Sequence, residues 1–255
     1  MHPQEPRRQQ DLDLTSVWQD LDILPRFNSM ATPADSRHAV DIHVASISCG
    51  PSPWRLIARK RQEAGGRAKE HASFNLKAGD EAPSADFVCA LLNSPVANAY
   101  VHCHLKKGDN LPCTLLNLPT PRLRVCDTGK VAQAVANYRK MKTMEIGSSA
   151  GRLKNAYLRI DAEILRCYNL YPRMEKEILD LFYGYQRPGV PFVLTKYFPA
   201  DFEPCIPLHE YLSPEYKLST AGELRKRLQT FDDPEISQAL RIACEAFTLD
   251  PEVND

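Results

Sequence analysis

The sequence contains little glycine and lacks the glycine-rich motifs that bind nucleotides. Glycine accounts for 11 of the 255 residues, which is about 4% against a usual value of about 7%. Neither the Gly-x-x-x-x-Gly-Lys-Ser/Thr phosphate loop nor the Gly-x-Gly-x-x-Gly dinucleotide fingerprint occurs. Because nucleotide-binding folds need such glycines to bring the backbone close to phosphate groups, their absence argues against those folds.

Signals for membrane insertion, export, metal binding and common hydrolase chemistry are also missing. No apolar run approaches the roughly 18 residues of a membrane-spanning helix, and residues 1–14 do not form a secretory signal. The 8 cysteines include no Cys-x-x-Cys pair. The Gly-x-Ser-x-Gly spacing at residues 147–151 lacks the preceding strand that a nucleophile elbow needs. We therefore expect a cytoplasmic protein with unpaired cysteines, no metal, no cofactor and no catalytic activity of its own.

The net charge is zero, but the charges are unevenly distributed. Residues 1–35 carry 3 basic and 6 acidic side chains, residues 36–198 carry 24 and 14, and residues 199–255 carry 5 and 12. The middle therefore has a charge of +10 and the C-terminal part a charge of −7. A basic middle favours a polyanionic partner, and the alternative is that the oppositely charged regions pack against each other.

Hydrophobic patterning divides the chain into four parts and predicts the α+β fold class. Residues 1–35 are polar, and we expect a flexible leader with one short amphipathic helix between Leu12 and Leu24. Residues 36–125 predict a small mixed β-sheet with a long helix, and residues 126–189 predict a helical hairpin. Residues 190–255 predict a proline-rich strap and an irregular, acidic helical tail.

Period-two alternation around Val40, Ile42 and Val44 indicates a strand, and residues 55–77 predict a two-stranded hairpin with Gly65-Gly66 at its tip. The apolar positions between 87 and 101 then predict the long helix. Further sequence signals define its ends and its surroundings. Ser84 or Asp86 can cap the helix, Pro95 breaks it after Asn93-Ser94, and three prolines predict an extended segment over 112–125.

Apolar stripes along the next region predict its helices. Val131, Val135, Tyr138 and Met141 share one helical face, and further stripes occupy residues 153–168 and 174–185. Pro172 suits the first position of the last of these helices. Together these stripes predict the antiparallel helical hairpin.

Basic residues gather in three clusters that can contact DNA phosphates or bases. The first cluster lies in the predicted hairpin and comprises Arg55, Arg59, Lys60, Arg61, Arg67 and Lys69. The second lies at the end of the long helix and comprises His104, Lys106, Lys107 and Asn110. The third lies on the next helix and comprises Arg139, Lys140 and Lys142. Each cluster taken alone could also be a solvated face, whereas three in one basic segment favour a nucleic-acid partner.

A metal-dependent nuclease is a less favoured alternative. Asp201 is followed by Glu215 and Lys217, and metal-dependent nucleases use an acidic pair with a nearby lysine to hold Mg²⁺. Glu215 follows Ser213-Pro214 in a predicted turn instead of a strand hairpin, which favours a solvated loop.

Two long stretches resemble parts of one family. Residues 91–121, LLNSPVANAYVHCHLKKGDNLPCTLLNLPTP, resemble the target-recognition domain of the adenine-N6 DNA methyltransferases of restriction–modification systems. Residues 160–192, IDAEILRCYNLYPRMEKEILDLFYGYQRPGVPF, resemble the helical C-terminal segment of the same proteins. The resemblance covers about residues 50–200 and implies a target-recognition-like fold that binds double-stranded DNA.

The catalytic signatures of that family do not occur. Its (Asn/Asp/Ser)-Pro-Pro-(Tyr/Phe/Trp) motif and its glycine-rich S-adenosylmethionine loop are missing, and in GPSPW (50–54) Ser52 separates the two prolines. The resemblance therefore implies a DNA-binding specificity module without a methyltransferase active site, which works with a separate methylase catalytic subunit. A protein-interaction subunit and a truncated remnant of such an enzyme stay open as alternatives.

Overall fold

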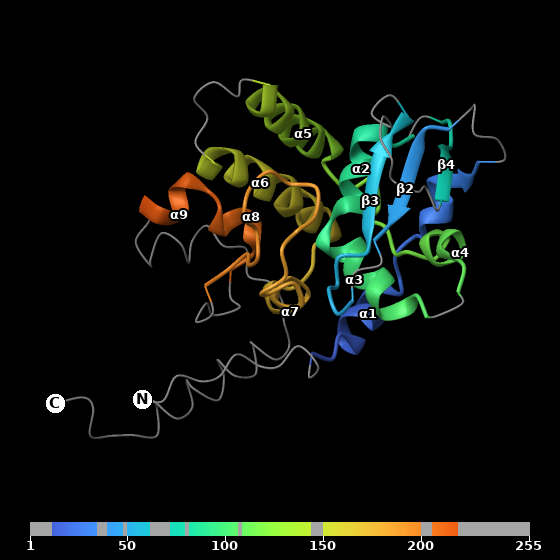
Figure 1. Cartoon of the computed structure of the whole chain (residues 1–255), viewed down its shortest axis with the longest axis horizontal. Coiled ribbons are helices and arrows are strands. Elements are labelled where there is room, and N and C mark those ends of the chain that lie inside the picture. The colour runs from blue at the N-terminus through green and yellow to red at the C-terminus, as the bar shows by residue number, and fades with distance from the viewer. Residues whose placement is uncertain are drawn as a thin grey trace. The chain divides into compact units, whose positions relative to one another are not determined.

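The computed structural model describes residues 12–34, 40–47, 50–61, 72–79, 82–106, 109–143, 150–199 and 206–218. This part of the chain has the α+β fold that the sequence predicts, with its elements arranged as in Figure 1. The strands are β1 (Ala31–Pro33), β2 (Ile42–Ser46), β3 (Leu56–Lys60) and β4 (Ala72–Leu76). The helices are α1 (Thr15–Leu21), the 3₁₀ turn η2 (Phe27–Ser29), α2 (Ala85–Asn93), α3 (Pro95–His104), α4 (Leu111–Leu116), α5 (Thr128–Thr143), α6 (Ala150–Tyr168), α7 (Pro172–Asp180), α8 (Leu208–Tyr211) and α9 (Pro214–Leu218).

Contacts along the chain define two units, Met1–Leu212 and Ser213–Asp255, and α9 belongs to the second. The first unit includes the positions near residues 35, 125 and 189 at which composition places boundaries. All of the sheet and the helices α1 to α8 belong to this first unit.

The four described strands pair antiparallel in the order β1-β4-β2-β3. Ile42 of β2 lies opposite Lys60 of β3 and also opposite Phe74 of β4. The predicted hairpin of residues 55–77 is therefore wrong, because its two strands flank β2 instead of pairing with each other. Residues 47–55 connect β2 to β3, and consecutive strands usually lie next to each other in a sheet.

Two further features of the predicted sheet differ from the described structure or lie outside it. The sheet is antiparallel throughout its described strands, where a mixed sheet was expected. The predicted hairpin tip at Gly65-Gly66, with Arg67 and Lys69, lies outside the described residues.

The stretch 14–33 is ordered and packs several of its apolar side chains into the hydrophobic core, so the expected flexible leader is wrong for it. The predicted amphipathic helix is present as α1, which buries Val17 and Leu21. Phe27 is also buried, and its ring meets that of Phe74 edge to face with centroids 5.2 Å apart. The polar composition favoured a leader, but a few large apolar side chains are enough to hold a short segment against the core.

Helices α2 and α3 follow one another through the middle of the first unit (Figure 1): α2 lies between the sheet and the pair α5 and α6, and α3 contacts α4 and α7. The structure confirms the helix break at Pro95, which occupies the first turn of α3. Ser84 caps α2 by accepting a hydrogen bond from the Phe87 N–H at 3.2 Å. Ser94 caps α3 in the same way, from the Ala97 N–H at 3.3 Å. Because Ser94 both ends α2 and caps α3, the new helix starts within one residue of the old one, and the break costs little stability.

Two asparagines close the outer edge of β3. The Asn93 side chain accepts a hydrogen bond from the Ala58 N–H and donates one to the Ala58 carbonyl, both at 2.9 Å. The buried Asn98 accepts hydrogen bonds from the N–H groups of Arg55 at 2.7 Å and Leu56 at 2.8 Å. The sequence pointed only to a role for Asn93 in the helix break, whereas its amide takes the place of a neighbouring strand and blocks edge pairing.

The segment 112–125 is not extended along its whole length, because α4 occupies its first part. Pro112 lies in the first turn of α4, where a helix has no partner for the N–H that proline lacks. Leu111 and Leu115 give α4 a buried face. The expectation of a fully extended segment gave too much weight to its prolines and too little to these leucines.

The helices predicted within residues 126–189 are present as α5, α6 and α7, and α7 begins at Pro172 as expected. The helices that pack as a hairpin are α5 and α6, whereas the turn at 169–172 was expected to join the hairpin pair. Asn169, with φ at +52°, lies just after α6 and turns the chain toward α7.

In the described part of the chain, no helix has both the length and the apolar character that a bilayer crossing requires.

A disulfide joins the two ends of this hairpin. Cys126 precedes α5 and Cys167 lies near the end of α6, and their Cα atoms are 4.8 Å apart. The expectation of unpaired cysteines is therefore wrong at these two positions. The hairpin brings together two cysteines that are 41 residues apart in the sequence. No spacing motif predicts this pairing.

Glu175 of α7 is a buried carboxyl with an unusual pKa. It accepts a hydrogen bond from the Leu208 N–H, and burial raises its pKa from 4.5 to about 8 despite that bond. At a pH between 4.5 and about 8, the Glu175 carboxyl keeps its proton in the folded state and releases it in the unfolded chain. The free energy of unfolding therefore falls as the pH rises from 4.5 to about 8.

We expect Glu175→Gln to stabilise the fold at pH 8.5 and to have little effect at pH 4. Glutamine keeps an acceptor oxygen but carries no charge, so it removes the cost of a buried carboxylate. Each kcal/mol gained should raise Tm by about 2–4 °C in a chain of this size, which circular dichroism melts at both pH values would measure. Glu177→Gln, at a partly exposed position two residues further on, is the control. Equal Tm shifts of Glu175→Gln at both pH values would contradict this assignment.

Candidate anion-binding cavity

A cavity of about 440 Å³ lies among β3, α2, α5, α6 and the turn at residues 187–189. This size is typical of small-molecule sites. Its polar and aromatic lining comprises Trp54, Arg59, Asp86, Asn93, Tyr138, Arg139, Lys142, Thr143, Tyr157, Asp161 and Arg187. Four of these side chains are cationic and two are carboxylates, so the lining has an excess of positive charge.

Arg187 forms the rigid inner wall of the cavity. Its side chain is 3% exposed and its guanidinium lies 4.5 Å from the ring centroids of both Trp54 and Tyr157. It is paired with the buried carboxylate of Asp161 and donates to the Tyr197 hydroxyl at 2.7 Å. Both rings contact its guanidinium and both of its terminal nitrogens bind protein groups, so Arg187 has a structural role.

The Asp161 carboxyl is paired within the protein through its Oδ2 atom. The Tyr197 hydroxyl donates to it at 2.8 Å, alongside Arg187. Burial raises the pKa of Asp161, and the charge and hydrogen bond of Arg187 oppose that rise. Arg187 also donates to the Asn93 carbonyl at 2.5 Å, which ties this wall to the end of α2.

Asp86 organises the more exposed part of the lining. Lys60 and Arg139 each place a nitrogen 2.8 Å from the same Asp86 oxygen. Burial alone would raise the pKa of Asp86, but these two cations outweigh it and lower the pKa below its ordinary value. Two positive charges share one carboxylate, so this part of the site keeps a net positive charge.

Arg59 and Lys142 supply further positive charge. Among the described residues, neither side chain has an acidic partner. Tyr138 and Tyr157 add hydroxyl groups, and burial raises the pKa of both, so both are protonated at neutral pH and can donate. Since both carboxylates of the lining are already paired, the available groups are mostly donors. Such a lining suits an anion whose oxygens only accept hydrogen bonds.

The structure brings together parts of two basic clusters that are far apart in the sequence. Arg59 and Lys60, from the first cluster, lie on β3, while Arg139 and Lys142, from the third, lie on α5. They meet around the cavity and around Asp86. Lys140 of the third cluster is exposed and is not part of the lining.

The remaining residues of the first cluster have other positions. Arg55 points toward α3, where its Nε and Nη2 lie 3.3 and 3.1 Å from Nδ1 of His102. Burial and the charge of Arg55 lower the pKa of His102, so the ring is neutral and its nitrogen can accept. Arg61 is exposed just after β3, and Arg67 and Lys69 lie outside the described residues.

The second cluster lies away from the cavity. His104, Lys106 and Asn110 are exposed near the end of α3, and Lys107 lies outside the described residues. His104 stacks on Tyr100 with ring centroids 4.1 Å apart. The distance between the cavity, marked by Asp86, and the second cluster, marked by His104, is roughly 27 Å at most, because the two residues are joined by a helical path that rises 1.5 Å per residue. Parts of the clusters therefore form two basic centres, one around the cavity with Arg59, Lys60, Arg139 and Lys142, and one near the end of α3 with His104, Lys106 and Asn110.

Several lining residues were not identified from the sequence. Tyr138 was expected only as part of an apolar stripe, although it lies four residues from Lys142 on α5, a spacing that places both on one helical face. Asp161 interrupts an apolar stripe, and a carboxylate on a buried helical face needs a partner. No sequence signal connects Asp161 to Arg187, because the partner lies in an irregular segment 26 residues away.

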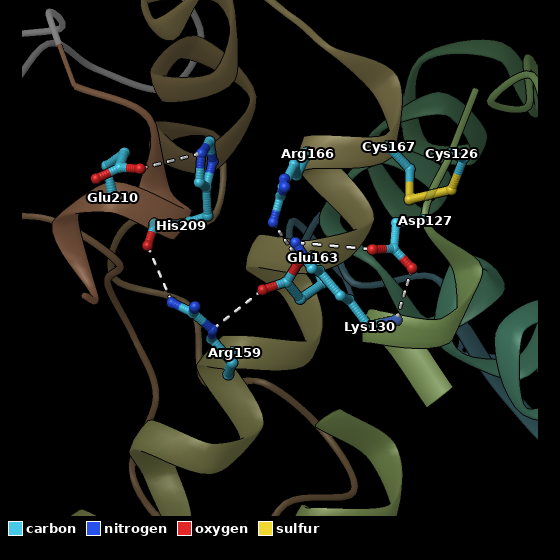
Figure 2. Close-up of polar contacts among 9 residues, drawn as sticks. All are labelled: Cys126, Asp127, Lys130, Arg159, Glu163, Arg166, Cys167, His209 and Glu210. Carbon is cyan, nitrogen blue, oxygen red and sulfur yellow. Dashed lines mark hydrogen bonds and ion pairs between the residues drawn. A yellow bond between two sulfur atoms is a disulfide. The ribbon is translucent and has the colours of Figure 1, made fainter. Parts of the chain in front are cut away.

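A second charged group surrounds the disulfide and differs from the cavity (Figure 2). Glu163 is 6% exposed and lies 3.1 Å from Arg159 and 3.4 Å from Arg166. Figure 2 shows Lys130 reaching toward the same carboxylate while it pairs with Asp127 at 3.7 Å. Here three cations face three carboxylates, with Glu210 as the third, so the group is electrically balanced. We assign it a structural role.

His209 completes this balanced group. Burial lowers its pKa to about 4; the charge of Glu210 opposes this shift, and the charges of Arg166, Arg159 and Lys130 add to it. The imidazole is therefore neutral at pH 7 and adds no charge. The His209 carbonyl accepts a hydrogen bond from Arg159 at 3.0 Å and so joins α8 to α6.

The residues of the nuclease alternative do not form a site in the described structure. Asp201 lies outside the described residues, and Glu215 is in the first turn of α9, which belongs to the second unit. Within the described ranges, no group of three or more His, Cys, Asp or Glu side chains is arranged to hold a metal ion.

No protein-family model, no curated protein and no solved structure matches this chain. What the chain does must therefore be inferred from its own residues and their geometry.

Proposed function

We propose that this chain is a DNA-binding specificity module that binds double-stranded DNA through its two basic centres and carries no methyltransferase site of its own. The observation that supports this most is the meeting of the β3 and α5 basic residues around one donor-rich cavity. The charge of +10 over residues 36–198 and the family resemblance of residues 50–200 point in the same direction. The proposal includes a cytoplasmic location and a separate methylase subunit that performs the chemistry.

The two basic centres would contact phosphates at two places along a duplex. Arg59 and Lys142 can neutralise phosphates without first breaking an ion pair, since they have no acidic partner among the described residues. Lys106 and Asn110 would bind the second place. The two basic centres are separated by roughly 27 Å at most along the helical path, which corresponds to about eight base pairs at 3.4 Å each. The contacted region should therefore be slightly less than one helical turn.

We expect salt-dependent binding of duplex DNA that weakens when the cavity cations are removed. Counterion release from 6 to 10 phosphates should lower the affinity by about 10³–10⁵ between 50 and 200 mM salt. Arg59→Gln and Lys142→Gln should each lower the slope of log K against log salt by about one. Fluorescence anisotropy with a labelled 24-base-pair duplex, titrated at several salt concentrations, measures both quantities.

Lys140→Gln is the matched control for Lys142→Gln. Lys140 lies two residues away on the same helix, is exposed and does not line the cavity. Its substitution should change the slope less than that of Lys142. Absence of duplex binding, or binding whose affinity does not depend on salt, would contradict the proposed function.

A further inference from the structure

We propose that the cavity holds the terminal phosphate of a DNA strand, so that this chain binds phosphorylated ends more tightly than hydroxyl ends. This inference rests on the proposed DNA binding and adds a preference for a particular part of the DNA. Three properties of the cavity support it: its concave shape, its excess of hydrogen-bond donors and the rigidity of its inner wall.

The shape of the site favours a chain end over the middle of a duplex. The lining comes from β3, α2, α5, α6 and the turn at residues 187–189, and it surrounds a concave space of about 440 Å³. An internal phosphate is attached on both sides to a wide duplex, so it can only touch the rim of such a space. A terminal phosphate is attached on one side only and can enter.

The electrostatics favour a phosphomonoester over a phosphodiester. A terminal phosphate has a charge of about −1.5 to −2 at pH 7 and three acceptor oxygens, whereas each internal phosphate has a single negative charge. Arg59 and Lys142 supply two cations, and Arg139, positioned by Asp86 at 2.8 Å, supplies a third. The hydroxyl of Tyr138 provides a further donor to the third oxygen.

The inner wall keeps these donors in place. Tyr138 packs edge to face on Tyr157 with ring centroids 4.9 Å apart, and Tyr157 in turn covers Arg187. Arg187 is fixed by Asp161 and by the Asn93 carbonyl. The α5 face that carries Lys142 is therefore held against a rigid surface, which lowers the cost of ordering the site when an anion binds.

The experiment compares one duplex sequence with four kinds of end: 5′-phosphate, 3′-phosphate, a 5′-phosphate capped as a methyl ester, and unmodified hydroxyl ends. We expect the chain to bind either the 5′-phosphorylated or the 3′-phosphorylated duplex at least about fivefold tighter than the duplex with hydroxyl ends, as for a new charge-assisted contact. The methyl ester removes one negative charge and should lose most of that gain. The two free phosphates distinguish which strand end enters the cavity.

Variants connect the preference to the cavity. Arg59→Gln and Lys142→Gln should reduce the preference for the phosphorylated end to less than about twofold, while Lys140→Gln should keep it. Tyr138→Phe retains the ring that packs on Tyr157 and removes only the hydroxyl, so it should weaken the preference without disturbing the fold. Circular dichroism melts establish that each variant is folded.

The outcomes separate this inference from the proposed function. Equal affinity of the wild-type chain for all four ends, with salt-dependent binding retained, would overturn the terminal-phosphate site and leave the proposed function in place. A preference that Lys140→Gln removes as fully as Lys142→Gln does would also overturn it. Absence of binding to any of the duplexes would contradict both proposals.

Discussion

Replacing Arg187 with methionine should destabilise the fold by about 3–5 kcal/mol, the usual range for removing one partner of a buried ion pair. Arg187 is 3% exposed and Asp161 is 1% exposed. Without the guanidinium, the Asp161 carboxyl is left in the interior with only the Tyr197 hydroxyl as a donor. Methionine fills similar space between Trp54 and Tyr157, so the loss should come from electrostatics more than from a cavity.

A double-mutant cycle isolates that electrostatic contribution. Asp161→Asn should also be destabilising, because it leaves the Arg187 charge without its partner. Since the double variant removes both charges together, it should lose clearly less than the sum of the two single variants. Urea denaturation measures each free energy of unfolding, and Arg61→Met, at an exposed position, should stay within about 0.5 kcal/mol of wild type. Additive effects, or a loss under 1 kcal/mol for Arg187→Met, would mean that the pair does not stabilise the fold.

Local elements followed from the sequence because local interactions decide them. The 3.6-residue spacing of apolar positions predicted α2, α3, α5, α6 and α7, and Pro95 and Pro172 marked helix starts correctly. Strand positions also followed from alternation, but strand partners did not. A β-strand presents the same backbone groups on both edges, so alternation alone could not show that β2 lies between β3 and β4.

The candidate site was predicted in part, and the missing part has a physical reason. Clusters of charge are visible in a sequence, which is why Arg59, Lys60, Arg139 and Lys142 were recognised as basic residues. Their convergence depends on the packing of α5 beside α2, which no local pattern encodes. A buried arginine such as Arg187 is indistinguishable from a surface arginine until the fold places its partner.

The Cys126–Cys167 disulfide should contribute about 4 kcal/mol, the loss of chain entropy expected for a closed loop of about 41 residues. It joins the start of α5 to the end of α6 and lies beside the balanced charge group of Glu163 (Figure 2). Three α5 side chains, Val131, Ala134 and Val135, are buried, and the disulfide adds a covalent link to the packing that holds this helix. Loss of the disulfide should therefore loosen the helix that carries Arg139 and Lys142.

Cys126→Ser, Cys167→Ser and the double variant should all lower Tm by about 8–16 °C, at 2–4 °C per kcal/mol. A thiol reductant should lower the wild-type Tm to a similar value and leave the double variant unchanged, because both changes open the same loop. Cys113→Ser, at an exposed cysteine outside the disulfide, is the control and should melt as wild type does. Peptide mapping by mass spectrometry identifies the bond directly. If reduction breaks the bond and the wild-type Tm stays constant, the disulfide does not stabilise this fold.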